Sequence, residues 1–135
     1  MTDEPDTSRG LLDTSIVIDY RDLLEVLPAQ SAISTITLGE LSGGLFATND
    51  PHERVERQAR LQWVEARFNP LPFDADAART YGSLCGLVLA SARRPRKRIA
   101  DIQIAATAVA NGLTLYTRNP DDFKGMDGFL NLVAV

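Results

Sequence analysis

The chain has 135 residues, enough for one domain with a single hydrophobic core. Its composition, 44% hydrophobic and 24% charged with a net charge of −4, indicates an ordinary globular protein and argues against a general nucleic-acid coat. No segment approaches the roughly 20 apolar residues of a membrane helix or contains an apolar signal core, so we expect no membrane partner and a cytoplasmic location. The single cysteine excludes an internal disulfide, and the single histidine argues against a zinc site or a Ser-His-Asp triad.

Strand-like and helix-like patterns alternate after a polar N-terminal tail, residues 1–9. The first part of the chain predicts a buried strand at 11–12, followed by a helix through 16–27 that Thr14 or Ser15 caps and Pro28 stops. A second strand is expected at 32–34. The next helix contains Leu38, Leu41 and Leu45, and Thr35 or Thr37 caps it. Asp50-Pro51 then opens a helix that Asn69-Pro70 ends.

The second part predicts an edge strand at 71–73, a helix from Asp74 through 77–89, a helix at 99–110 ended by Asn111-Gly112, and strands at 114–117 and 132–135. In the helix at 99–110, we expect one apolar stripe, formed by Ile99, Ile102, Ala106, Val109 and Ala110. Alternating strands and helices predict a mostly parallel sheet covered on both faces. The expected fold is therefore α/β, a three-layer α/β/α domain over residues 10–135.

Three acidic residues lie within apolar segments, where a charged side chain needs a partner. Asp13 follows one apolar run, Glu40 interrupts another, and Asp101 lies in the first turn of the helix at 99–110. Asp122 is a candidate fourth. All four can reach the edge formed by the carboxyl ends of the strands. Carboxylates that converge without matching cations favour a divalent metal, with helix capping as an equal alternative for Asp13 and Asp101.

Five of the 14 basic residues gather directly before Asp101. A charge run is usually a solvated loop, but this position favours a phosphate-binding surface. The residues of this basic segment are Arg93, Arg94, Arg96, Lys97 and Arg98.

Four short motifs, in this order and spacing, carry a resemblance to a known family. They are LLDTS at 11–15, TLGEL at 37–41, IADIQIAATA at 99–108 and TRNPDDF at 117–123. The sequence resembles the PIN-domain ribonucleases, most closely the VapC toxins of VapBC toxin–antitoxin modules, from about Gly10 to the C-terminus.

The resemblance implies a metal-dependent endoribonuclease that leaves 5′-phosphate and 3′-hydroxyl ends. It implies Asp13 and Asp101 as the core ligands of Mg²⁺ or Mn²⁺, with Glu40 and Asp122 holding a second ion or waters. Many relatives carry an acid where this chain has Asn119, so Asn119 is the alternative fourth residue. The expected supporting side chains are Thr14, Ser15, Thr117 and Asn119, and the basic segment is expected to bind RNA.

The resemblance also implies a small antitoxin of the VapB type and a homodimer. We expect the antitoxin to place an Arg or Lys among the acids and a helix in an apolar groove around Leu24, Leu41 and Leu45.

Two alternative functions remain, a PIN nuclease of RNA maturation and a non-catalytic RNA-binding module. A third class, a phosphotransfer domain, lacks its motifs: Asp13-Thr14-Ser15 is not Asp-x-Asp, and Thr117-Arg118-Asn119 offers no lysine.

Overall fold

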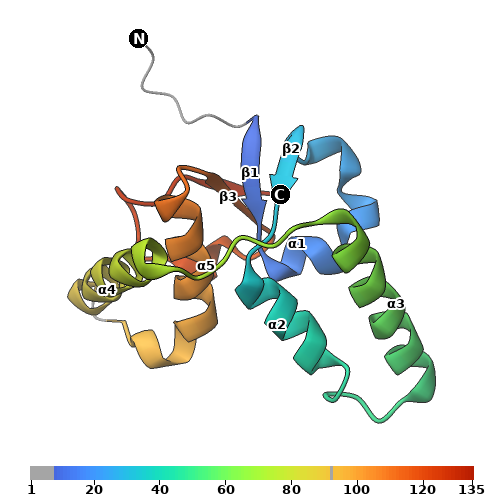
Figure 1. The fold of residues 1–135 in the computed structure, drawn as a ribbon. Coiled ribbons are helices and arrows are strands. Elements are labelled where there is room, and N and C mark those ends of the chain that lie inside the picture. Colours follow the sequence, from blue (N-terminus) through green and yellow to red (C-terminus); the bar gives the residue numbers. More distant parts are fainter. Residues whose placement is uncertain (1–7, 92) are drawn as a thin grey trace.

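The computed structural model describes residues 8–91 and 93–135, and of Lys97 only the backbone. In this part of the chain, four parallel strands form one sheet in the order β2-β1-β3-β4 (Figure 1). The strands are β1 (Arg9–Leu12), β2 (Gln30–Ala32), β3 (Thr114–Thr117) and β4 (Leu132–Ala134). The α-helices are α1 (Thr14–Ile18), α2 (Thr35–Gly44), α3 (Pro51–Arg67), α4 (Ala75–Ala90) and α5 (Ile99–Ala110).

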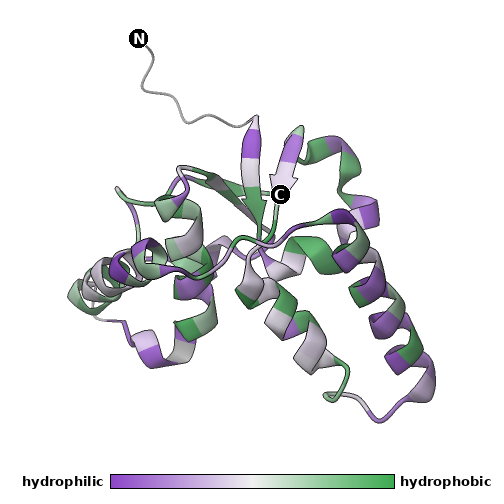
Figure 2. Ribbon diagram, in the orientation of Figure 1, coloured by the Kyte–Doolittle hydropathy of each residue, from purple (hydrophilic) through white to green (hydrophobic). Residues whose placement is uncertain are grey.

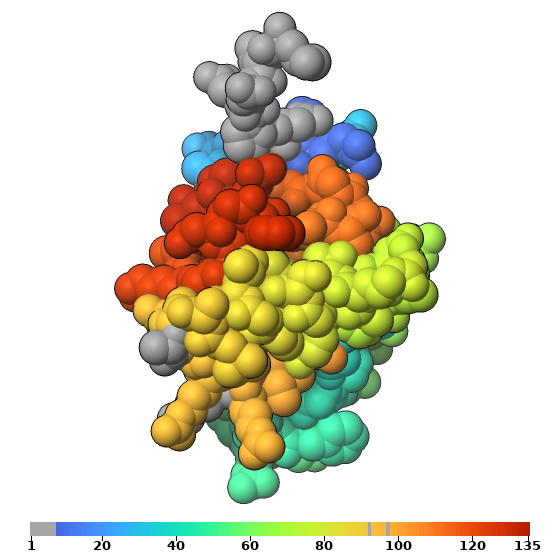
Figure 3. Space-filling model, turned by 90° about the vertical axis from the view of Figure 1, so that its left-hand side faces the viewer, coloured from blue at the N-terminus to red at the C-terminus, as the bar shows by residue number. Residues whose placement is uncertain are grey.

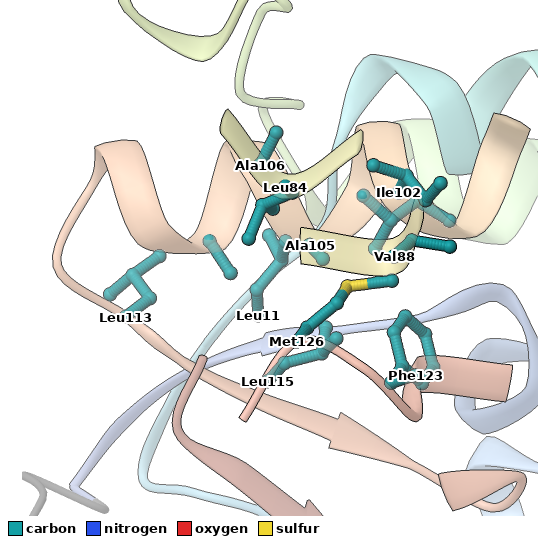
Figure 4. Close-up of a cluster of buried hydrophobic side chains, with 12 residues drawn as sticks. Leu11, Leu84, Val88, Ile102, Ala105, Ala106, Leu113, Leu115, Phe123 and Met126 are labelled. Atoms are coloured by element: carbon teal, nitrogen blue, oxygen red, sulfur yellow. The ribbon is translucent and has the colours of Figure 1, made fainter. Parts of the chain in front are cut away.

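The two central strands place alternate residues in two separate cores. Leu11 and Leu115 are paired across β1 and β3, and both join the core under α4 and α5 (Figure 4). The next pair, Leu12 and Tyr116, joins the core under α1, α2 and α3 on the other face. Figure 1 shows these two groups of helices on opposite sides of the sheet. The predicted three-layer α/β/α architecture is therefore confirmed.

The helices differ strongly in how much of their surface is covered. The long helix α3 carries charged residues along its outer side, whereas α5 is mostly apolar (Figure 2). Because α5 packs against α2, α4 and β3, its residues 104–108 are buried without a break. The predicted stripe is wrong at both ends, since Ile99 is 47% exposed and Ala110 is also exposed. No helix in the described residues is both long and apolar enough to cross a membrane.

The segment after β1 departs most from the sequence-based expectation. The residue that caps α1 is Asp13, not Thr14 or Ser15, and the helix ends at Ile18 instead of continuing toward Leu27. Two short 3₁₀ helices follow, η1 (Tyr20–Asp22) and η2 (Leu24–Val26). The hydroxyls of Thr14 and Ser15 donate to acidic side chains instead, which leaves capping to the residue before them.

Three further boundaries also differ. The cap of α2 is Ser34, not Thr35 or Thr37, and β2 lies at Gln30–Ala32, not at 32–34. The predicted edge strand at 71–73 reduces to one bridge between Ser34 and Leu71, since Pro72 has no N–H with which to extend a ladder. The strand β1 begins inside the predicted tail, of which residues 1–7 lie outside the described residues.

The remaining helix boundaries are confirmed. Asp50 and Asp74 cap α3 and α4, and Asn111 ends α5, followed by Gly112 at a φ of +66°. Gly10 is needed for a different reason, because an added Cβ would lie 2.6 Å from the Tyr116 ring. The absence of a side chain at Gly10 therefore leaves room for the Tyr116 ring beside β1.

Strand order determines where a site can form. The chain leaves β1 for β2 on one side and later returns to β3 on the other, so the strand order reverses between β1 and β3. In parallel sheets, ligands bind outside the carboxyl ends of the strands at this point. The residues at this edge are Asp13, directly after β1, and Thr117, the last residue of β3.

Candidate active site

Asp13 is a buried carboxylate, 5% exposed, that lies between β1 and β3. Its backbone N–H donates to the Tyr116 carbonyl at 3.1 Å. Its Oδ1 accepts the Ile16 N–H at 3.1 Å and the Ser15 hydroxyl, and its Oδ2 accepts the Thr117 hydroxyl. Asp13 is therefore the cap of α1 and also an acid at the strand ends, so the two interpretations of its role are compatible.

Glu40 lies on an exposed turn of α2 and is bound by a hydroxyl from α1. Thr14 Oγ1 donates to Glu40 Oε1 at 2.7 Å. Thr14 Oγ1 also lies 3.1 Å from Oγ1 of Thr37, one turn before Glu40 on α2. The predicted supporting residues Thr14, Ser15 and Thr117 thus all contact an acid of the site.

Asp101, in the first turn of α5, is the acid whose ionisation is most disturbed. Burial and, to a smaller extent, the charges of neighbouring carboxylates raise its pKa to about 6. In order of their effect, these neighbours are Asp122, Glu40 and Asp13. Such an influence requires each of these three carboxylates to lie within electrostatic reach of Asp101. The structure therefore brings the four predicted acids together, while their catalytic role stays a prediction.

Asp122 lies on the 3₁₀ helix η4 (Pro120–Phe123) and is paired with Arg98. Arg98 Nη1 is 3.1 Å from Asp122 Oδ1. The Arg98 charge also lowers the pKa of Asp101, against the effect of the carboxylates. Arg98 was predicted to contact RNA, but in this structure it is the counter-charge of a site acid.

The rest of the basic segment lies beside the first turn of α5. It includes the 3₁₀ helix η3 (Pro95–Arg98), and Figure 3 shows it projecting from the lower edge of the face that α4 covers. Arg94 and Arg96 are exposed, and Arg93 is half-buried with its N–H bonded to the Val88 carbonyl. The side chain of Lys97 lies outside the described residues. Two arginines are thus accessible next to the acids.

The predicted alternative for the fourth acid, Asn119, lies at the same edge. Its backbone N–H donates to Thr117 Oγ1 at 2.9 Å, and its side chain is exposed. Thr117 therefore links the Asn119 backbone to the Asp13 carboxylate.

Comparison with known proteins assigns this chain to a family. The profile of the PIN domain matches residues 10–128. The chain belongs to the PIN-domain family. Among relatives of this PIN domain, Ribonuclease VapC5 of Mycobacterium tuberculosis is 40% identical over 123 residues, covering 88% of each chain. Ribonuclease VapC1 of Rickettsia felis is 34% identical, covering 87% of this chain and 90% of the relative. Within the family, the PIN domain groups with the VapC ribonucleases, as the four motifs indicated.

Solved structures agree with this placement. The PIN domain superposes on a chain of VapBC-5, a member of the VapBC family of toxin–antitoxin systems from Mycobacterium tuberculosis, with a TM-score of 0.82. The two chains are 35% identical in sequence, and the superposition covers 95% of this chain and 99% of the other. For VapBC2 of Rickettsia felis bound to a promoter DNA fragment, the TM-score is 0.75 at 27% identity, with coverage of 93% and 97%. These likenesses extend over nearly the whole domain.

Three residues of this PIN domain that sequence reasoning did not assign also lie close to the site. Arg118 pairs with Asp19 at 2.7 Å, and its backbone N–H donates to the Ser15 hydroxyl at 3.1 Å. Thr37 lies one turn from Glu40 and was considered only as a helix cap. The i, i+3 spacing of Thr37 and Glu40 was the signal that placed both on one side of α2.

The donor set of the PIN domain suits a hard divalent cation. It consists of carboxylate and hydroxyl oxygens, which Mg²⁺ and Mn²⁺ prefer. In residues 8–91 and 93–135, no three His, Cys, Asp or Glu side chains are grouped closely enough to enclose an ion by themselves. Burial and repulsion by neighbouring carboxylates raise the Asp101 pKa, and a divalent cation would relieve this repulsion.

Proposed function

We propose that this PIN domain is a metal-dependent endoribonuclease and the toxin of a type II toxin–antitoxin system, acting in the cytoplasm. The observation that carries the proposal is the convergence of Asp13, Glu40, Asp101 and Asp122 where the strand order reverses. The names of the relatives, VapC ribonucleases, support RNA as the substrate.

Hydrolysis joins the oxygen of a water molecule to phosphorus while the P–O3′ bond breaks, leaving 5′-phosphate and 3′-hydroxyl ends. A bound Mg²⁺ or Mn²⁺ supplies positive charge toward the phosphate and makes a nearby water more acidic. Asp13 and Asp101 are the residues that would hold the ion. Asp13 is kept in one orientation by three donors, which preorganises its carboxylate. Thr14 engages Oε1 of Glu40, so Oε2 is available to orient a water.

The decisive experiment compares two capping aspartates. Asp13→Asn and Asp74→Asn both keep an acceptor at a helix cap, but only the first removes a charge from the site. We expect Asp13→Asn to lower Mg²⁺- or Mn²⁺-dependent RNA cleavage at least a hundredfold, about the upper range for loss of a metal-supporting group. Asp74→Asn should cleave normally. Cleavage that persists in EDTA, or in Asp13→Asn, would overturn the metal-dependent mechanism.

The basic segment is proposed to attract the RNA backbone toward the acids. Arg94 and Arg96 are exposed, whereas Arg98 is engaged with Asp122. Changing Arg94 and Arg96 to Ala should reduce the slope of log affinity against log salt by about 0.7–0.9 for each phosphate that the variant no longer neutralises. Arg54→Ala, on the exposed side of α3, is the control. An unchanged slope would make the segment a solvated loop.

A groove that begins at the site is the proposed docking place of the antitoxin. A hollow of about 310 Å³ lies between α2 and α3, and Thr14 and Glu40 form one end of it. A second hollow of about 580 Å³ shares Ile18, Glu56 and Arg60 with the first and reaches Trp63. The groove predicted from the sequence was centred on Leu24, Leu41 and Leu45. Of these three residues, Leu41 lines the first hollow, whereas Leu24 and Leu45 line neither.

The chemistry of this groove suits an amphipathic helix with basic residues. Its lining includes the apolar side chains of Val17 and Leu41. Five acidic residues line the two hollows against three arginines, Arg21, Arg57 and Arg60, so the lining carries more negative than positive charge. Such a helix would place an Arg or Lys at Glu40. An antitoxin as partner is supported by the similarity of the fold to a chain of VapBC-5, a member of the VapBC family of toxin–antitoxin systems.

Expression of this PIN domain alone should arrest cell growth if it is a toxin. Co-expression of the product of the adjacent small gene should relieve the arrest, and so should the substitution Asp13→Asn. A protein that cleaves RNA but does not arrest growth would favour the alternative, a PIN nuclease of RNA maturation.

We also propose a homodimer, in which two sites would face one RNA cleft. Sedimentation of the isolated chain tests this, and a monomer at all concentrations would contradict it.

A further inference from the structure

A line of three hydroxyls runs from the core to Glu40. Ser34 and Thr37 are fully buried, and Thr14 is half-buried. Oγ of Ser34 lies 3.5 Å from Oγ1 of Thr37, and Oγ1 of Thr37 lies 3.1 Å from that of Thr14. Thr14 then donates to Glu40 Oε1 at 2.7 Å. Buried hydroxyls require partners, and here the partners are one another.

The protons in this line have one consistent direction. Each hydroxyl carries one proton, and the Thr14 proton goes to the Glu40 carboxylate, the short and charge-assisted contact. The 3.1 Å contact between Thr14 and Thr37 therefore uses the Thr37 proton, and the 3.5 Å contact uses that of Ser34. Ser34 is itself fixed, because it accepts the Thr37 N–H at 3.1 Å as the cap of α2.

Glu40 needs such a support more than the other acids do. It is exposed on α2 and has three rotatable side-chain bonds, so its carboxylate loses considerable rotamer freedom when it is held. Its partner Thr14 lies on a different helix and must itself be oriented. We propose that Thr37 is a positioning residue for Glu40, acting through the Thr14 hydroxyl. This inference rests on the proposed metal site.

A double-mutant cycle on Mn²⁺ affinity, measured by titration calorimetry, tests the proposal. Thr37→Val keeps the shape of the side chain and removes the hydroxyl. We expect it to weaken Mn²⁺ binding about tenfold, the lower end of the range for residues that support metal ligands, and to have less than about a twofold effect in a Glu40→Gln background. Thr37→Ser should restore wild-type affinity.

The matched control is Thr107→Val, since Thr107 is a fully buried threonine whose hydroxyl donates to the Gln103 carbonyl of its own helix. It should leave Mn²⁺ affinity unchanged. An equal effect of Thr37→Val in both backgrounds, or no effect in either, would overturn the proposal. If Thr37→Val does not fold, Thr14→Val interrupts the same line and should give the same loss. A wild-type protein that binds no Mn²⁺ would instead refute the proposed metal site.

Discussion

On the α1 side of the site, hydrogen-bond donors surround the carboxylates, whereas on the α5 side burial and neighbouring carboxylates raise the pKa of Asp101 and the charge of Arg98 opposes them. Asp13 accepts three hydrogen bonds and Glu40 accepts one from Thr14. Asp101 has a pKa raised to about 6 by burial and by its acidic neighbours. The fold therefore orients the carboxylates on the α1 side with hydrogen bonds, while on the α5 side the proposed cation would offset the repulsion that Asp101 experiences.

The largest expected effect of this difference is on folding stability. Asp13→Ala should lower the free energy of unfolding by about 2–3 kcal/mol, because it removes a helix cap and leaves the Ser15 and Thr117 hydroxyls without their acceptor. Asp74→Ala, which removes only the cap of α4, should cost about 1 kcal/mol. Urea unfolding measures both. Equal losses would show that the hydroxyls around Asp13 contribute no stability.

The second prediction concerns the opposite half of the site. Without metal at pH 7.5, Asp101→Asn should stabilise the protein by about 1 kcal/mol, a figure already reduced for the partial exposure of Asp101. Added Mg²⁺ should stabilise the variant less than the wild type. A variant that is less stable than the wild type and still responds fully to Mg²⁺ would argue against a shared acidic site.

The pH dependence of this effect follows from the sign of the shift. Because folding raises the Asp101 pKa from the ordinary 3.8 to about 6, its stabilising contribution is complete below about pH 3.8 and is lost as the pH rises through 6. The advantage of Asp101→Asn should therefore grow between pH 4 and pH 7, which urea unfolding at several pH values would measure.

The smallest effect is expected at Arg98. Arg98→Ala removes the cation that opposes the acids, so the metal-free protein at pH 7.5 should lose about 0.5 kcal/mol. The stabilisation by Mg²⁺ should then become larger, since one competing positive charge is gone. Arg96→Ala, in the same segment but exposed, is the control. Identical behaviour of the two variants would remove Arg98 from the site.

The sequence was sufficient to predict the layers, and it singled out Asp101 and the three acids whose charges act on it. Alternation of strands and helices predicted the parallel sheet, and acids placed in apolar segments predicted residues that the structure brings together. Both predictions depend on local pattern and on the general position of sites at strand ends.

Tertiary contacts decided what the sequence could not. Asp13, the cap of α1, also accepts a hydrogen bond from the hydroxyl of Thr117, a residue of β3 that local pattern does not bring near Asp13. The pairing of Arg98 with Asp122 likewise joins two separate turns. A charge run by itself gave no indication that one of its members faces inward.

The contact between Asp13 and Thr117 joins residues 104 positions apart in the sequence. Domains fold during synthesis only as their segments emerge, and long-range parallel pairing forms late. A ribosome that has made the first hundred residues therefore carries β1 and Glu40 but lacks Asp101, β3 and Asp122. The four acids can therefore assemble only after Asp122 has been made, so the proposed site cannot form on the first hundred residues alone.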